Sequence, residues 1–188
     1  MVFQQIPYAC PAEDKENMWD CKPGETGKIE SYDQFGPSTW PASGRYTSVN
    51  GRVAPVFARM QTGEIQRWRM IHAGVRDTIR LQVVKRASGV PSLGEAGDPG
   101  PDEYSGQYCT REMMPFHVIA ADGLTTTRAM PTRDVVLQPG YRWDGLFAFD
   151  EPGIYCIIDA AMPGPGTVNH QSRSRQLLGF VEVTGDPR

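Results

Sequence analysis

The chain has 188 residues, a length that fits one domain with generous loops. Apolar residues make up 39% and charged residues 22% of it, a globular composition that argues against disorder. A net charge of −3 provides no basic stripe for phosphates, so we expect no nucleic-acid partner. No window approaches the roughly 18 consecutive apolar residues of a membrane span, and the first residues lack the basic start and apolar core of a signal peptide, so we expect neither in this chain.

Short apolar alternations recur along the whole chain, whereas a helical i, i+3, i+4 stripe of useful length is hard to find. This pattern predicts an all-β fold. Residues 2–6 form the first expected strand, which Pro7 closes. Residues 8–45 are rich in Gly, Pro, Asp and Ser with little periodicity, so we expect a long irregular loop there.

An Asn-Gly dipeptide marks the first predicted hairpin. Residues 46–49 form a strand that leads into Asn50-Gly51, a pair typical of a type I′ turn. Residues 52–60 are expected to form the returning strand. Pro55 lies inside that strand, and because proline cannot donate to the hydrogen-bond ladder, it indicates an edge strand or a bulge.

Residues 65–72 have the clearest strand pattern in the chain. Trp68, Met70 and His72 alternate with two arginines, so we expect these three side chains on one face and the arginines on the other. Residues 78–84 alternate in the same way, and we predict that they pair with this strand.

The second half of the chain continues the strand pattern after a break. Recurring Gly and Pro predict a second long loop over residues 86–112, a length that often accompanies a function or an interface. Residues 116–121 then form a strand that ends at Asp122-Gly123, a second hairpin signal. This many short strands, without helices to connect them, predict an antiparallel β-sandwich. Four more strands are expected at residues 134–138, 143–149, 153–159 and 176–183.

Four cysteines, at Cys10, Cys21, Cys109 and Cys156, have none of the paired spacings of zinc sites. An even count allows two disulfides, with three possible pairings. We predict a Cys10–Cys21 bridge, because both residues lie in one irregular segment, and therefore a Cys109–Cys156 bridge. Disulfides favour an oxidising compartment, and hence a periplasmic or secreted location.

Copper is the metal to consider in a β-sandwich that contains Cys, His and Met. A blue-copper site needs two His and one Cys, often with a weak axial Met. Cys156 is followed by Met162, but no histidine lies between them. His72 and His117 lie within predicted strands and are interpreted as histidines satisfied by hydrogen bonds in or beside the core, and His170 as a surface-loop residue. We therefore predict no metal site in this chain.

Nucleophilic catalysis has no clear signature either. The chain contains no Gly-x-Ser-x-Gly elbow. Cys156 lies in an apolar strand, which favours a buried or disulfide-bonded sulfur over a reactive thiolate. Nothing selects a pair among the loop carboxylates, so we predict no catalytic residue in this chain.

Several strings, taken together, carry a family resemblance. The Asn50-Gly51 turn is followed by Gly63-Glu64-Ile65-Gln66-Arg67-Trp68-Arg69-Met70-Ile71-His72-Ala73-Gly74, and further matching strings occur in the same order at residues 116–123, 137–144 and 149–155. This combination resembles the second domain of multicopper oxidases, the laccase-like enzymes. The resemblance covers most of the chain, from residue 1 to about residue 184.

In that family three cupredoxin-like sandwiches are joined in one polypeptide, and the first and third supply the copper ligands. Their His-x-His and His-Cys-His signatures do not occur here. The resemblance therefore implies one cupredoxin-like Greek-key β-sandwich over residues 1–188, the non-metal middle domain of such an oxidase. It implies flanking copper-binding domains as partners. Copper, phenol oxidation and oxygen reduction would belong to the complete enzyme, and we expect this chain alone to be inactive.

The resemblance also suggests a substrate-side residue. In many three-domain members the middle domain helps to shape the phenol pocket near the type 1 copper. Some fungal members place a carboxylate a few residues before the Asn-Gly turn, and Arg45 roughly occupies that place here. Arg45 is therefore the candidate substrate-binding residue.

Two other hypotheses remain open. The chain could be a free-standing cupredoxin-like module that uses the long loops 8–45 and 86–112 to hold a partner or a small ligand, or one chain of a split oxidase. A domain removed from its neighbours would expose docking patches and self-associate, unless these side chains fold back over the ends of the sandwich. The candidate side chains are Trp19, Phe35, Trp40, Tyr104 and Met113.

Overall fold

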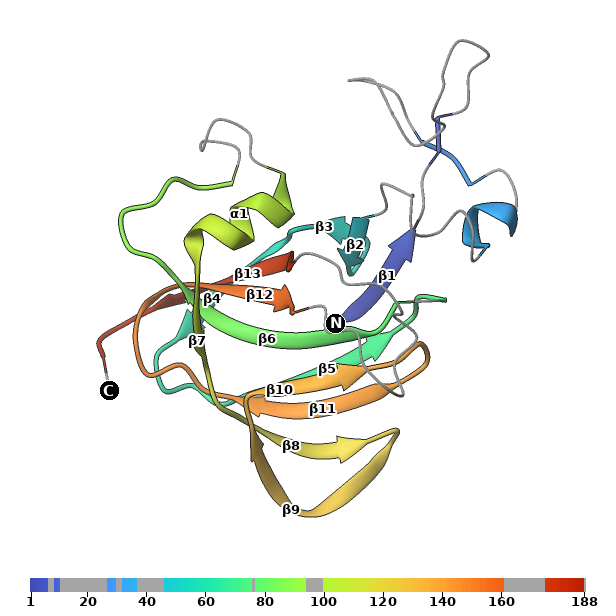
Figure 1. Ribbon diagram of the computed structural model, residues 1–188. Helices are drawn as coiled ribbons and strands as arrows, with labels where there is room; N and C mark the ends of the chain where they lie inside the picture. The colour runs from blue at the N-terminus through green and yellow to red at the C-terminus, as the bar shows by residue number, and fades with distance from the viewer. Residues whose placement is uncertain are drawn as a thin grey trace.

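A computed structural model describes residues 1–6, 9–10, 27–29, 32–36, 46–75, 77–93, 100–160 and 175–187. Two β-sheets pack against each other as a sandwich (Figure 1). The first sheet has the order β3 (Arg52–Val53), β2 (Tyr46–Val49), β1 (Val2–Ile6), β5 (Gln66–His72), β11 (Arg142–Phe147), β8 (Phe116–Ala121) and β9 (Leu124–Thr132). The second has the order β10 (Asp134–Leu137), β6 (Ile79–Arg86), β12 (Gly153–Asp159), β13 (Gln176–Thr184) and β4 (Val56–Gln61), and β7 (Cys109–Met113) also pairs with β6.

Alternation of apolar and polar side chains explains how the sheets face each other. On β5, Trp68, Met70 and His72 are buried, as predicted, while Arg69 on the opposite face is exposed. On β6 of the other sheet, Ile79, Leu81 and Val83 face the same core. Because successive side chains of a strand point to opposite faces, each sheet places every second residue in the space between the sheets.

The predicted pairing of residues 65–72 with 78–84 is wrong. β5 pairs with β1 and β11 in the first sheet, whereas β6 pairs with β7, β10 and β12 in the second. The alternating pattern shows which side of each strand faces the core. Two strands that face each other from opposite sheets have the same pattern as two strands that are hydrogen-bonded neighbours in one sheet, so the pattern does not distinguish the two arrangements. The chain therefore passes from one sheet to the other between β5 and β6 instead of forming a hairpin.

Residues 52–60 form two strands, β3 and β4, instead of the single strand expected. Pro55 lies between them, and its carbonyl accepts a hydrogen bond of 2.8 Å from the Phe180 amide. The chain leaves the first sheet at this proline and enters the second. The prediction of an edge position is confirmed, because β3 and β4 are the outermost strands of the two sheets on this side.

Both predicted tight turns are confirmed. Asn50 and Gly51 have φ values of 52° and 76°, and Asp122 and Gly123 have values of 49° and 88°. A type I′ turn requires positive φ at both central residues, a conformation that Asn, Asp and Gly tolerate best. The first turn connects β2 to β3, and the second connects β8 to β9.

The expectation of a purely antiparallel sandwich needs a correction, because both sheets are mixed. β1 pairs with β5 in parallel, and β13 pairs with β4 in parallel. Parallel neighbours require a connection that crosses over, and here other strands lie between the partners along the chain, for example β2, β3 and β4 between β1 and β5.

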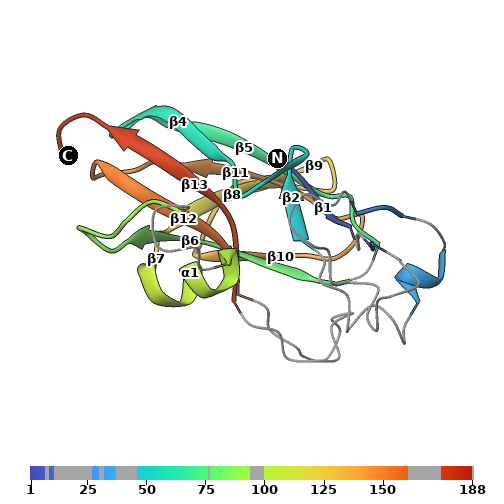
Figure 2. The same cartoon turned by 90° about the horizontal axis from the view of Figure 1, so that it is seen from above.

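The expected irregular loop at residues 86–112 contains an α-helix, α1 (Pro101–Tyr108), followed directly by β7. Figure 2 shows α1 over the outer face of the second sheet. The helix begins with proline at its N-terminus, where the missing N–H costs nothing, but it has few apolar residues in a helical stripe. A second, smaller core lies beneath it, formed by Val84, Tyr104, Cys109, Cys156, Ile158, Leu177 and Phe180.

Tyr104 was a candidate for an exposed docking surface, and this prediction is wrong. Its side chain is completely buried between α1 and the second sheet, and its hydroxyl donates to the Pro91 carbonyl at 2.8 Å. Phe35, in the 3-10 helix η1 (Tyr32–Phe35), and Met113 are half-buried. In the predicted loop 8–45 the structure describes η1 and a bridge between Ala9 and Lys28. The other two candidates, Trp19 and Trp40, lie outside the described residues.

Candidate functional site

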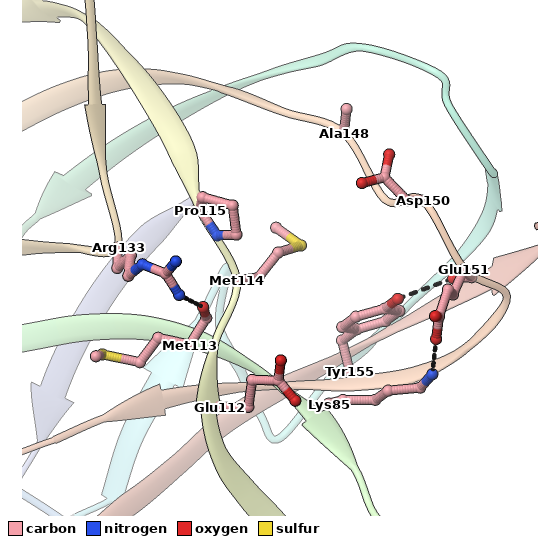
Figure 3. Close-up of a pocket in the computed structure, with 10 residues that line it drawn as sticks. All are labelled: Lys85, Glu112, Met113, Met114, Pro115, Arg133, Ala148, Asp150, Glu151 and Tyr155. Carbon is pink, nitrogen blue, oxygen red and sulfur yellow. Dashed lines mark hydrogen bonds and ion pairs between the residues drawn. The ribbon is translucent and has the colours of Figure 1, made fainter. Parts of the chain in front are cut away.

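A pocket of about 360 Å³ lies at one end of the sandwich (Figure 3). Four separate segments supply its walls: β6, the end of β7 with its connection to β8, the turn between β9 and β10, and the connection from β11 together with β12. Its volume lies at the lower end of the range of small-molecule pockets. The lining residues are Lys85, Glu112, Met113, Met114, Pro115, Arg133, Ala148, Asp150, Glu151 and Tyr155.

Tyr155 is the most deeply buried of the residues that line the pocket. Its side chain is buried on β12, and its ring packs against Phe149 with the ring centroids 4.7 Å apart. The hydroxyl donates a hydrogen bond of 2.8 Å to the Glu151 carbonyl. Burial raises the pKa of the Tyr155 phenol, because the anion would lose its hydration. The ring therefore presents a neutral, electron-rich surface to the pocket.

Lys85 and Glu151 neutralise each other at the rim. The Lys85 ammonium group donates to a Glu151 carboxylate oxygen, as Figure 3 shows. This hydrogen bond raises the pKa of Lys85 and lowers the pKa of Glu151, so the pair remains ionised across the neutral range. Both side chains are partly exposed, so the pair adds little to folding stability.

The wall opposite Tyr155 is held by backbone contacts. Arg133 donates from Nη1 to the Met113 carbonyl at 2.8 Å, and the Met114 amide donates to the Val83 carbonyl at 2.8 Å. Met114 also packs against the main core. These contacts fix the short connection at the point where the chain passes from the second sheet to the first.

Of the two histidines that the structure describes, His72 has no ring nitrogen available for copper. The ring of His72 is completely buried, with Nδ1 3.0 Å from the Gly74 amide and Nε2 2.6 Å from the Asp77 carbonyl. Both nitrogens are thus engaged, and the interpretation of His72 as a core histidine is confirmed. His117 is exposed on β8 instead of lying in or beside the core, and His170 lies outside the described residues.

The cysteines are likewise unsuited to copper. The predicted Cys109–Cys156 disulfide is confirmed, with the Cα atoms 6.1 Å apart, and it lies beneath α1. Cys10 is also disulfide-bonded, while its predicted partner Cys21 lies outside the described residues. A sulfur in a disulfide cannot supply the thiolate that a blue-copper site requires. The described Cys and His residues therefore do not fit a copper site.

The remaining site predictions have different outcomes. Arg45, the candidate substrate-binding residue, lies outside the described residues and stays a prediction. Within the described ranges, no three His, Cys, Asp or Glu side chains gather as a metal site would require. Of the pocket residues, the sequence pointed only to Met113, as a candidate for a docking surface and not for a pocket. The sequence Glu151-Pro152-Gly153 was interpreted only as a turn that separates two strands.

Comparison with solved structures gives the fold class. The 2F4 variant of the McoA multicopper oxidase from the hyperthermophile Aquifex aeolicus is 18% identical, with a TM-score of 0.53, over 77% of this chain and 26% of that chain. A multicopper oxidase of Campylobacter jejuni, described as a metallo-oxidase, is 13% identical, with a TM-score of 0.51, over 78% of this chain and 25% of that chain. The chain therefore has the cupredoxin-like fold that multicopper oxidases contain, and it spans about a quarter of their length.

No protein-family model matches the sequence, and no curated protein is significantly similar to it. None of the helices in the described ranges is long and apolar enough to cross a membrane.

Proposed function

We propose that this chain is the non-metal middle domain of a laccase-like multicopper oxidase. In that role it serves as a scaffold between two copper-binding cupredoxin domains and contributes part of the substrate-side wall. Phenol-type oxidation and oxygen reduction then belong to the complete enzyme. Copper would supply the electron-transfer chemistry in the neighbouring domains, while this chain positions them.

One observation carries the proposal: a cupredoxin-like sandwich whose buried histidine and disulfide-bonded cysteines have no free donor atom. Both ring nitrogens of His72 are engaged, and Cys109 and Cys156 are bonded to each other. The motif Gly63 to Gly74, on which the family resemblance rests, coincides with β5 and its two ends. A cupredoxin-like fold whose described core histidine and cysteines are already engaged would suit a structural domain between two copper domains.

The disulfide bears on where the protein works. Cys109 and Cys156 are nearly inaccessible beneath α1, and stable structural disulfides form in oxidising compartments. This supports the proposed periplasmic or secreted location.

A free-standing binding module remains the second candidate function, and one observation favours it. The pocket beside Tyr155 has the volume of a small-molecule site and is complete within this chain. A split oxidase, the third hypothesis, has no separate structural support and would be recognised by copper domains encoded on neighbouring genes.

Copper loading of the isolated chain tests the main proposal. After incubation with Cu(II) and dialysis, we expect less than stoichiometric copper and no intense blue absorption, because scattered histidines bind without a defined geometry. Fusion to flanking copper domains should produce oxidase activity that neither part has alone. A stoichiometric blue copper centre in the isolated chain would contradict the middle-domain role.

The same role predicts exposed docking surfaces. Among the described residues, four aliphatic side chains are more than half exposed: Val56 at 58%, Ile65 at 70%, Val75 at 60% and Leu124 at 77%. We expect self-association or binding of an apolar dye by the lone chain, and loss of both in the fusion. A monomeric chain that binds no dye at high concentration would favour the free-standing module.

A further inference from the structure

Two carboxylates that line the pocket are not bonded to any other side chain in the described part of the protein. Among the described residues, Glu112 and Asp150 form neither a hydrogen bond nor an ion pair, although both line the cavity. In Figure 3 they approach the same space from opposite sides, Glu112 from below and Asp150 from above. This space therefore has negative charge on two walls.

Neither cation that lines the pocket is hydrogen-bonded or ion-paired to these carboxylates, although the charge of Glu112 contributes to raising the pKa of Lys85. Lys85 is bonded to Glu151, and Arg133 lies behind the Met113 carbonyl to which it donates (Figure 3). The lining contains three acidic and two basic side chains, and one acidic and one basic side chain, Glu151 and Lys85, form an ion pair with each other. The space between Glu112 and Asp150 consequently favours a positively charged occupant.

The other walls of the same space are apolar. The Met114 side chain extends into it from one side, and the buried Tyr155 ring faces it from the other (Figure 3). Pro115 and Ala148 complete the lining. A thioether, an aromatic ring and aliphatic carbons contact hydrocarbon well, and an aromatic face also attracts a cation. The occupant should therefore combine a positive charge with an apolar stem.

We propose that this pocket binds a small organic ammonium ion, with its charged nitrogen between Glu112 and Asp150 and its apolar stem against Met114 and Tyr155. The volume of about 360 Å³ accommodates a small molecule and limits its size. The proposal does not rest on the role of the chain as an oxidase domain.

Titration of the intact, disulfide-bonded chain by NMR tests this assignment. The probe is hexylammonium, and its matched control is 1-hexanol, which has the same stem without the charge. We expect hexylammonium to shift the amide signals of residues 112–114 and 148–151, with weak affinity that falls as salt is added. Equal binding of hexanol and hexylammonium would overturn the proposal.

Three substitutions change the charge of the pocket in opposite directions. Glu112→Gln and Asp150→Asn should each weaken hexylammonium binding about two- to fivefold, the range of a partly exposed ion pair. Lys85→Met should tighten it by a similar factor, because it frees the Glu151 carboxylate. Glu103→Gln, an exposed change on α1, is the control and should have no effect. Unchanged binding in both acid variants would refute the site.

A polypeptide lysine could present the same chemistry. N-acetyl-lysine methylamide is therefore titrated beside hexylammonium. Weaker binding of the lysine derivative supports a small-molecule ligand, because its amides do not fit the apolar walls. Clearly tighter binding of the lysine derivative would overturn the small-molecule assignment in favour of a protein partner.

Discussion

The Nε2 atom of His72 donates its proton to the main-chain oxygen of Asp77 at 2.6 Å, while Nδ1 accepts from the Gly74 amide at 3.0 Å. An imidazole that accepts at one nitrogen and donates at the other is neutral, with its proton on Nε2. The ring joins the end of β5 to the segment that crosses toward the second sheet. Burial lowers the pKa of His72 from 6.5.

This relationship predicts loss of stability in mild acid. The unfolded chain takes up a proton at His72 near pH 6.5, whereas the folded chain does so only at lower pH. The contribution of His72 is therefore complete above about pH 6.5 and declines as the pH falls toward the folded-state pKa. Urea unfolding at a series of pH values measures this decline. His117→Gln, at an exposed histidine, should retain it, and an NMR titration of the His72 ring in the folded chain should show a midpoint below 6.5.

The Cys109–Cys156 bridge should stabilise the fold by about 4 kcal/mol, the chain-entropy value for its sequence separation of 47 residues. The double variant Cys109→Ala, Cys156→Ala should lower the free energy of unfolding accordingly. We expect faster hydrogen exchange in α1 and β7 before the sheets are affected, because the bridge anchors the start of β7 beneath the helix. Non-reducing mass mapping should also find the predicted Cys10–Cys21 bridge, and a different pairing would contradict both assignments.

Arg175 should anchor the end of α1. Its guanidinium donates to the carbonyls of Cys109 at 3.0 Å and Thr110 at 2.6 Å, just after the helix ends. Arg175→Met should destabilise the chain by about 1 to 3 kcal/mol, because it removes the charge-assisted hydrogen bonds to these carbonyls. Arg175→Lys should recover only part of this loss, since an ammonium group cannot reproduce the planar fork. Full recovery by lysine would show that charge alone matters.

Replacing either of two glycines by alanine should change the stability of the fold, in opposite directions. A Cβ atom on Gly179 of β13 would lie 2.8 Å from the Pro55 carbonyl oxygen, whereas a Cβ on Gly106 of α1 would meet nothing within 4 Å. Gly179→Ala should therefore destabilise by about 1 to 3 kcal/mol. Gly106→Ala should stabilise by about 0.5 to 1 kcal/mol through helix propensity. Thermal and urea unfolding of the two variants checks both signs.

Local features of the sequence predicted local features of the fold. Alternation over residues 66–72 correctly placed Trp68, Met70 and His72 in the core, and Asn50-Gly51 correctly predicted a tight turn with positive φ. Each of these depends on the conformation of a few adjacent residues, which side-chain size and backbone freedom restrict directly.

Only the tertiary structure decided which strands became neighbours and where the pocket formed. β5 and β6 lie in opposite sheets. Tyr104 is buried because α1 packs on the second sheet, although the sequence around Tyr104 strongly indicates neither a helix nor a buried side chain. The pocket joins Lys85, Glu112 and Asp150 from segments far apart in the chain. Such contacts depend on how the strands pack against each other over long distances in the sequence. An apolar strand face can pack against several other apolar faces equally well, so the local pattern does not determine its partner. The partner is fixed only when the whole core assembles.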